Sequence, residues 1–302
     1  MYTRKRKFVF ISLLFLVAII VFVATYAVVH WQTSAQINNL NTTLENTESE
    51  RNALEKKVAL YEPETVSFDY QSKYPDLFVD EKTAQTPFKA VDSKTCYLTF
   101  DDGPSSNTQK ILDALADHNA HATFFIIGSQ IPGNETLLKQ AIADGNTLGV
   151  HTQCHDYDTI YASVDAYLDD FYECYTALYE ATGVKPTIFR FPGGSINAYN
   201  SRVYHEIIAE MTRRGFTYYD WNVSSNDASS TKQSKEAIVK AVVSGTKGSY
   251  HPIVLMHDAA AKDTTADAVS NMLDQLQGLG YTCDALDPSV LPVTFAYTNP
   301  TS

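Results

Sequence analysis

From residue 95 onward, short runs typical of buried β-strands alternate with longer runs whose apolar residues have helical spacing. The strand candidates are residues 95–100, 122–127, 147–150, 187–190, 217–222, 252–256 and 281–284. The helix candidates lie between them at residues 108–118, 135–144, 164–182, 201–214, 234–243 and 265–279. Such alternation predicts parallel strands covered by helices. We therefore expect an α/β fold, either a barrel or an open sheet, over residues 91–295.

The first thirty residues have a different composition from the rest of the chain. Four cations at positions 4–7 precede an apolar run over residues 8–29, and about 20 apolar residues are enough to cross a bilayer as a helix. The next basic residue is Arg51. Because basic flanks stay in the cytoplasm, we expect a cytoplasmic tail at 1–7, an uncleaved single-pass anchor at 8–30 in the cell membrane, and an extracellular remainder. A cleaved signal peptide is the alternative.

Residues 31–90 connect this run to the α/β region. Residues 31–60 are polar, with apolar side chains at heptad-like positions, namely Ile37, Leu40, Leu44, Leu54 and Val58. This pattern predicts a helical stalk, either a solvated spacer or a coiled coil that forms a homodimer. Residues 61–90 contain Pro63, Pro75 and Pro87 and are interpreted as a linker that wraps onto the following domain.

The net charge bears on whether the protein binds nucleic acid, and the cysteine content bears on which disulfides it could form. The formal net charge is −12, so we expect no nucleic-acid partner, because phosphate binding requires a basic surface. Outside the membrane, disulfides between Cys96, Cys154, Cys174 and Cys283 would be permitted. Three pairings are open, and no Cys-x-x-Cys pair of the kind found in zinc knuckles occurs.

Two adjacent carboxylates, Asp101 and Asp102, follow the first predicted strand within Thr-Phe-Asp-Asp-Gly-Pro. Like charges this close disfavour each other's ionised form unless a cation neutralises them. A metal ion would do so, because one carboxylate could bind the ion while the other remained a base. The alternative is an Asp-Gly-Pro turn that only ends the strand.

The third predicted strand is followed by His151-Thr152-Gln153-Cys154-His155. Imidazoles four residues apart share one face of a helical turn and can bind the same ion. Two histidines and a carboxylate that leave a coordination position open form a common type of hydrolytic metal site. Cys154 should point away from the histidines, and we expect it to be packed or disulfide-bonded.

Two more strand ends carry polar groups. Arg190, in Arg-Phe-Pro-Gly-Gly-Ser, can keep a carboxylate ionised, and the following turn can present backbone N–H groups to an oxyanion. His257, in Leu-Met-His-Asp, lies where a leaving group would need a proton. A loop salt bridge and a structural histidine are the alternatives.

These motifs, in this order, resemble those of the polysaccharide deacetylase family, the NodB-like carbohydrate esterases of family 4. The resemblance covers roughly residues 90–295 and implies a distorted (β/α)7–8 barrel. It also implies a metal-dependent hydrolase that removes N-acetyl groups from N-acetylglucosamine residues of an extracellular polysaccharide, with peptidoglycan expected first. An O-deacetylase of xylan, a deacetylase of a secreted exopolysaccharide and an inactive glycan-binding scaffold remain alternatives.

The resemblance also assigns a ligand set and a base. It implies that Asp102, His151 and His155 hold Zn²⁺ or another divalent ion such as Co²⁺. Asp101 would be the general base, and Arg190 would pair with Asp101 and keep it ionised.

The other roles concern the substrate side of the site. The resemblance implies that the Gly193 N–H stabilises the oxyanion, that His257 protonates the departing amine, and that Trp221 and Leu255 line the acetyl-methyl pocket. Many relatives carry an aromatic residue where Gly193 stands, so we expect an altered cleft wall.

The acid that supports His257 has two candidates, Asp220 and Asp227. Asp220 precedes Trp221 on a predicted strand, whereas Asp227 lies in the loop beyond it. We favour Asp220, because strand residues are held more rigidly than loop residues.

Overall fold

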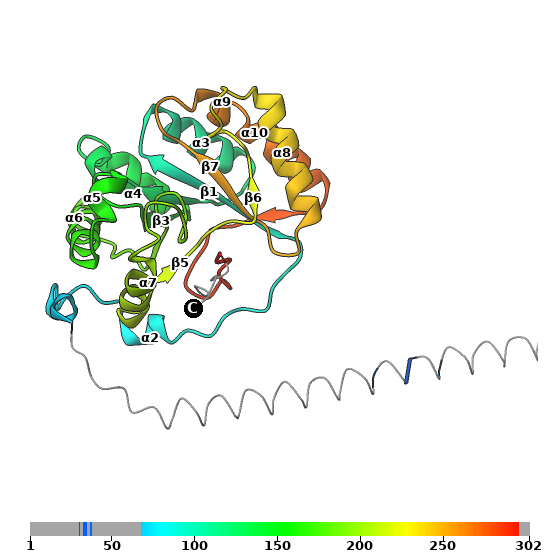
Figure 1. Cartoon of the computed structure of the whole chain (residues 1–302). Coiled ribbons are helices and arrows are strands. Elements are labelled where there is room, and N and C mark those ends of the chain that lie inside the picture. Colours follow the sequence, from blue (N-terminus) through cyan, green and yellow to red (C-terminus); the bar gives the residue numbers. More distant parts are fainter. Residues whose placement is uncertain (1–29, 31–32, 35–36, 38–67, 296–302) are drawn as a thin grey trace, which may run out of the picture. The chain divides into compact units, whose positions relative to one another are not determined.

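The computed structural model describes residues 30, 33–34, 37 and 68–295 (Figure 1). The predicted tail at 1–7, nearly all of the anchor at 8–30 and most of the stalk at 31–60 lie outside the described residues. Within the described part, no helix combines the length and the apolarity that crossing a membrane requires.

One curled sheet of eight parallel strands forms the centre of the described domain (Figure 1). The strands are β1 Thr95–Gly103, β2 Thr123–Ile126, β3 Thr147–Val150, β4 Ile188–Phe189, β5 Thr217–Tyr218, β6 Val223–Ser224, β7 Ile253–His257 and β8 Thr282–Cys283. Their order is β5-β4-β3-β2-β1-β7-β6, and β8 pairs with the beginning of β1. The α/β class with parallel strands is therefore confirmed.

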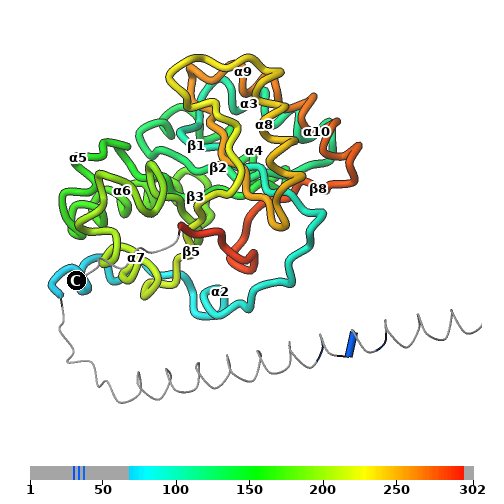
Figure 2. The backbone as a smooth tube through the Cα atoms, turned by 45° about the vertical axis from the view of Figure 1, so that its right-hand side comes forward, coloured from blue at the N-terminus to red at the C-terminus, as the bar shows by residue number. Residues whose placement is uncertain are grey.

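The predicted barrel does not close by strand pairing within the described residues, because β5 and β6 lie at opposite ends of the sheet order. Within the predicted strand at 217–222 only β5 forms, and the short strand β6 follows that range. Between them, Asp220 donates its N–H to the carbonyl of Val293, 2.8 Å away. The C-terminal segment, red in Figures 1 and 2, thus lies beside β5 and occupies part of the open side.

Helices cover the outside of the curled sheet (Figure 2). The longer helices are α3 Ser106–Asp117, α4 Glu135–Ala143, α6 Val164–Thr182, α7 Tyr204–Arg213, α8 Lys235–Gly248 and α10 Val269–Gly278. Short elements are η1 Asp69–Ser72, α2 Glu81–Ala84, η2 Gly128–Gln130, α5 Tyr157–Ile160 and α9 Asp263–Ala266. The short elements escaped prediction because four residues are too few to show a helical period.

The core forms between the sheet and these helices. Phe100 of β1 stacks on Phe124 of β2, with ring centroids 5.3 Å apart, and both side chains are fully buried. On α6, Leu168 and Phe171 are also fully buried. Each such side chain contributes roughly 1.5–3 kcal/mol through its burial. This packing holds the carboxyl ends of the central strands in fixed positions.

The compact unit begins at Phe68 rather than at residue 91. Arg214, at the end of α7, is buried and donates to backbone carbonyls in the segment before α2, including those of Lys73 at 2.9 Å and Tyr74 at 3.0 Å. Glu210 accepts from the same guanidinium at 2.7 Å. Part of the predicted linker at 61–90 is therefore fixed to the domain.

All four cysteines are free thiols. Cys96 and Cys283 are register partners on β1 and β8, and both are buried. Cys174 is buried in α6, whereas Cys154 is exposed.

Candidate metal and catalytic site

Asp101 and Asp102 lie at the carboxyl end of β1, where the strand contains an irregularity. Asp101 pairs with Phe125 of β2 and Gly103 pairs with Ile126, so Asp102 is an extra residue between them. Asp102 has a left-handed φ of 74°. Consecutive strand side chains normally point to opposite faces, and a bulge can turn one of them. The bulge therefore explains how two adjacent carboxylates serve one site.

Gly103 completes this turn because its position has no room for a side chain. A Cβ atom there would lie 2.1 Å from Oδ2 of Asp258. Asp258 is fully buried, accepts from the Thr108 hydroxyl at 2.5 Å, and donates its N–H to the carbonyl of Asp101 at 3.0 Å. Burial raises the pKa of Asp258 to about 7. Because residue 103 has no side chain, the buried Asp258 can pack against the end of β1.

His151 and His155 lie in the loop after β3, not on the helical turn that their spacing predicted. Thr152 and His155 have left-handed φ values of 72° and 56°, which no helical turn contains. The two imidazole centroids nevertheless lie 5.2 Å apart. The expectation of a helix was wrong because a tight loop can bring residues at this spacing together equally well.

A buried carboxylate outside the predicted set holds this loop. Asp170 of α6 accepts the backbone N–H groups of Gln153 at 2.6 Å and Cys154 at 3.0 Å. The side chain of Cys154 is exposed and free, so the expectation that it packs or forms a disulfide is wrong. An acid on the buried face of α6, next to Phe171, was the signal that could have revealed Asp170.

The three predicted ligands converge. Nε2 of His151 and Nε2 of His155 lie 3.4 Å and 3.3 Å from Oδ1 of Asp102. Two ligands bound at about 2.0–2.1 Å to one tetrahedral ion would be about 3.3 Å apart. Oδ1 of Asp102 is buried and lacks a hydrogen-bond partner among the described residues. These residues therefore fit a divalent ion with three protein ligands.

The protonation of the two imidazoles also suits such an ion. Nδ1 of His151 lies 2.8 Å from the carbonyl of Arg190. A carbonyl only accepts, so this nitrogen donates and Nε2 keeps its lone pair. Burial lowers the pKa of His155, which favours the neutral form that binds metals.

Arg190 holds one oxygen of Asp101. The guanidinium is fully buried, and its Nη1 donates to Oδ1 of Asp101 at 2.9 Å. It also donates to the Thr99 hydroxyl at 2.5 Å and to the carbonyls of Tyr219 at 2.8 Å and Asp220 at 3.1 Å. The other oxygen of Asp101, Oδ2, lies 3.9 Å from Nε2 of the first histidine ligand. One carboxylate oxygen is thus fixed, and the other faces the ligand set.

His257 is register partner to Asp101 on the neighbouring strand β7. Its Nδ1 lies 2.8 Å from Oδ1 of Asp227, and its backbone N–H donates to Oδ2 of the same carboxylate at 2.8 Å. Thr265 donates to Oδ2 at 2.9 Å. Burial alone would lower the pKa of His257, but the bond to Asp227 and the nearby negative charges raise it to about 9. The expectation that Asp220 contacts His257 is therefore wrong.

Asp220 has a different set of partners. It is fully buried and accepts the N–H and the hydroxyl of Ser195, at 2.8 Å and 2.5 Å, and the N–H of Phe295 at 2.7 Å. Burial raises its pKa. Asp220 follows the end of β5, so the rigid strand position that favoured it does not exist. Its carboxylate instead joins the loop after β4 to the C-terminal segment.

The two residues predicted to line the acetyl pocket lie near these groups. Leu255 precedes His257 by two residues on β7, so both side chains point to the same face of the sheet. The Trp221 ring lies 5.7 Å from the guanidinium carbon of Arg190 and packs edge-on against Phe295, with centroids 5.0 Å apart. Sequence reasoning missed Phe295.

Gly193 lies in the turn after β4 with a left-handed φ of 76°. Its N–H donates to no backbone or side-chain acceptor in the part of the chain that the structure describes, so it is free to meet an oxyanion. A Cβ atom at this position would lie 3.1 Å from the Tyr157 hydroxyl. The Tyr157 hydroxyl of α5 therefore lies next to this turn, which the sequence did not indicate.

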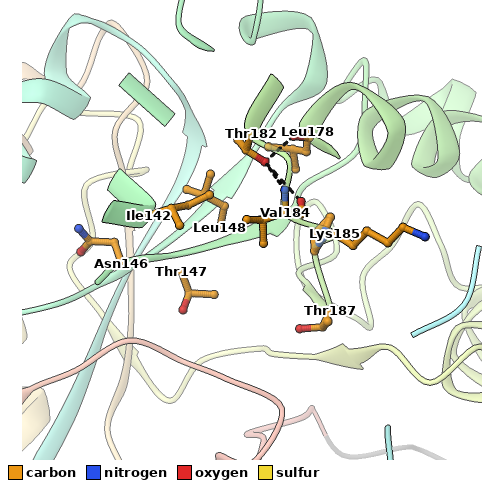
Figure 3. A pocket seen from close by; sticks show the side chains of 10 residues that line it. Ile142, Asn146, Thr147, Leu148, Leu178, Thr182, Val184, Lys185 and Thr187 are labelled. Carbon is orange, nitrogen blue, oxygen red and sulfur yellow. Dashed lines mark hydrogen bonds between the residues drawn. The ribbon is translucent and has the colours of Figure 1, made fainter. Parts of the chain in front are cut away.

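A separate cavity of about 140 Å³ lies at the amino ends of β3 and β4 (Figure 3). It is lined by apolar and neutral polar side chains such as Leu148, Leu178 and Thr187, and by Lys185, which extends away from them. It contains neither an acid nor an imidazole among its lining residues. The acidic and histidine side chains of the candidate site lie instead at the carboxyl ends of the strands.

Comparison with known proteins shows which family this chain resembles. The polysaccharide deacetylase family model matches residues 88–218. A peptidoglycan-N-acetylglucosamine deacetylase of Bacillus cereus is 29% identical over 222 residues, 72% of this chain and 79% of that protein. PgdA, a peptidoglycan-N-acetylglucosamine deacetylase of Listeria monocytogenes, is 34% identical over 209 residues, 68% of this chain and 41% of that protein.

A solved structure extends the likeness to the fold. The catalytic domain of a peptidoglycan N-acetylglucosamine deacetylase from Eubacterium rectale superposes with a TM-score of 0.67 at 34% identity. The match covers 70% of this chain and 97% of that domain. The chain therefore belongs to the polysaccharide deacetylase family.

Proposed function

We propose that this protein removes acetyl groups from N-acetylglucosamine residues of peptidoglycan, with Zn²⁺ or a similar divalent ion held by Asp102, His151 and His155. The observation that carries the proposal is the meeting of this ligand set with two charged pairs, Asp101–Arg190 and His257–Asp227, at one edge of the sheet. A divalent ion bound there would make a water molecule more acidic and polarise the acetyl carbonyl.

Asp101 is the general base in this proposal. Its Oδ2 is free of the arginine contact and lies on the side of the ligand set, so it can take a proton from the attacking water. Arg190 pairs with the carboxylate and fixes its rotamer, because both groups are buried and their contact is charge-assisted. The Gly193 N–H stabilises the negative oxygen that forms when water attacks the carbonyl.

His257 supplies the proton that the departing amine needs. Asp227 accepts from Nδ1 and thereby directs Nε2 toward the reacting groups. The raised pKa of His257 keeps the ring protonated at neutral pH. The acid and the base thus lie on adjacent strands.

The substrate is tested by measuring acetate release. The purified full-length chain, with Zn²⁺ added, is incubated separately with peptidoglycan, acetylated xylan and an acetylated exopolysaccharide, and free amines are measured in parallel. We expect acetate and new amines in equal amounts from peptidoglycan. Acetate from xylan alone would identify an O-deacetylase, and no acetate from any polymer would favour a glycan-binding scaffold.

We also propose that residues 8–30 anchor the protein in the cell membrane, with the catalytic domain outside. The apolar run and its basic flank support this arrangement. Peptide mapping of membrane-extracted protein tests it. We expect peptides from residues 8–30 to remain attached, whereas a mature N-terminus near Val28 would indicate cleavage and secretion.

A further inference from the structure

Four tyrosine rings form a ladder from the core to the surface beside the ligand set. Tyr167 and Tyr161 are buried, Tyr157 is half-buried, and Tyr199 is 58% exposed. Successive centroids lie 6.1, 6.0 and 4.8 Å apart, and successive planes are inclined by only 8°, 9° and 22°. The exposed ring is therefore the outer end of a stack that begins in the core.

Hydrogen bonds in the loop after β4 hold the outer end of the ladder. The Asn197 side chain donates to the carbonyls of Pro192 at 3.2 Å and Gly194 at 3.0 Å, and it accepts the N–H of Tyr199 at 2.8 Å. The Tyr161 hydroxyl donates to the carbonyl of Pro192 at 2.7 Å. These bonds fix the backbone of Tyr199, and its ring rests on Tyr157, so the ring should lose little conformational freedom when a ligand covers it.

The ladder reaches the rim of the candidate site. The Tyr157 ring lies 5.4 Å from the imidazole of His155, between centroids. The Tyr157 hydroxyl lies beside Gly193, the residue with the free backbone N–H. The exposed face of Tyr199 is thus one ring away from a metal ligand.

The chemistry of such a surface selects a particular type of ligand. The face of an aromatic ring carries excess negative charge and attracts weakly polarised C–H groups. A pyranose ring with equatorial substituents presents a flat layer of axial C–H bonds on each face. A flat, exposed aromatic ring that is held in place therefore suits the C–H face of a sugar.

We propose that Tyr199, backed by Tyr157, is the stacking platform for the sugar residue next to the one that is deacetylated. The proposal rests on the proposed function for the identity of the reacting sugar. It assigns a subsite that makes the enzyme prefer a glycan chain to a single acetyl compound.

The test compares a chain with a minimal acetyl compound. We would measure kcat/KM for the N-acetylglucosamine tetramer and for 4-nitrophenyl acetate in the wild type, Tyr199→Ala, Tyr199→Phe and Tyr250→Ala. Tyr250 is the matched control, because it is 69% exposed but precedes β7 at the amino end of the sheet. Calorimetry would give the Kd of the tetramer for Asp101→Asn protein with and without Tyr199→Ala.

We expect Tyr199→Ala to lower kcat/KM for the tetramer about fivefold to tenfold, mainly through KM, and to affect the small ester much less. Tyr199→Phe keeps the ring and should restore most of the loss, and Tyr250→Ala should change neither substrate. The Kd for the tetramer should rise by a similar factor. Equal losses on both substrates, or an unchanged Kd, would overturn the platform. A wild type that binds the tetramer through Tyr199 but releases no acetate would overturn the proposed function alone.

Discussion

The carboxyl ends and the amino ends of the central strands bury different kinds of side chain. At the carboxyl ends, charged groups are buried in pairs, Asp101 with Arg190 and Asp227 with His257. At the amino ends of β3 and β4, the cavity of Figure 3 is lined by apolar and neutral polar residues, with Lys185 as its one cation. Both regions belong to the same sheet and the same helical layer.

The difference indicates what each end is for. Burying a charge is unfavourable unless it is paired, and replacing a buried pair by apolar residues is often neutral or stabilising. The two buried pairs beside the ligand set are therefore poorly explained by stability. They are well explained by chemistry that requires fixed protonation states. Substitutions at the two ends should accordingly affect different properties.

The largest effect should follow from Asp101→Asn. The amide cannot accept the proton from water at neutral pH, so kcat should fall about a thousandfold. The Tm should fall as well, because the buried Arg190 guanidinium loses its charged partner. Acetate release from peptidoglycan and thermal unfolding would be measured on the same preparation. A decrease of less than tenfold would remove Asp101 from the role of base.

Asp227→Asn should have the next largest effect, and it distinguishes Asp227 from Asp220. The protonated form of His257 exists below its pKa of about 9 and is lost as the pH rises through that value. Without the Asp227 carboxylate this pKa falls, so the alkaline limb of the pH–rate profile should move to lower pH. At pH 8 the rate should fall at least about tenfold, equivalent to about 1.4 kcal/mol. If Asp220→Asn moved the limb and Asp227→Asn did not, the pairing described here would be incorrect.

Asp220→Asn should act mainly on stability. The buried carboxylate accepts three hydrogen bonds from Ser195 and Phe295, and an amide offers a single acceptor oxygen. The free energy of unfolding should fall by about 2 kcal/mol, which denaturant titration would measure. An unchanged unfolding curve together with a lost activity would instead assign Asp220 to the chemistry.

Lys185→Ala should have the smallest effect. The residue belongs to the cavity at the amino ends, and its ammonium lies 5.5 Å from the Tyr179 ring centroid. Exposed contacts of this kind contribute roughly 0.5–1 kcal/mol. We expect kcat/KM for peptidoglycan within about twofold of the wild type. A large loss of activity would show that the amino ends take part in the function.

Much of the site at the carboxyl ends of the central strands could be predicted from sequence, because its residues lie in short contiguous motifs at strand ends. Asp101 and Asp102 lie at the carboxyl end of β1, and His151 and His155 follow β3, so parallel strands bring them to one edge. The loop conformation of the histidines could not be predicted, because left-handed residues and a helical turn can give the same approach. The supporting Asp170 comes from a distant helix, and its two loop contacts leave no local motif.

The choice between Asp220 and Asp227 depended on long-range contacts. Asp220 was favoured as part of one strand over 217–222, whereas β5 ends at Tyr218. Asp227 reaches its partner because Thr265 binds its carboxylate and Lys262 donates to its carbonyl at 2.7 Å. Both residues lie more than thirty positions away in the sequence. The outer contact of the tyrosine ladder escaped prediction for the same reason, since Tyr199 comes from the loop after β4 and Tyr157 from α5.

The ligand set itself is tested most directly by the metal content of purified protein. Elemental analysis would be performed on the wild type, Asp101→Asn and His155→Ala after purification with Zn²⁺ and removal of unbound ions. Asp102, His151 and His155 are all intact in the first two proteins, so we expect about one divalent ion per chain in both. His155→Ala removes one of three ligands and should contain much less. Active wild-type protein without a bound metal, or full occupancy in His155→Ala, would contradict the assignment of these three residues.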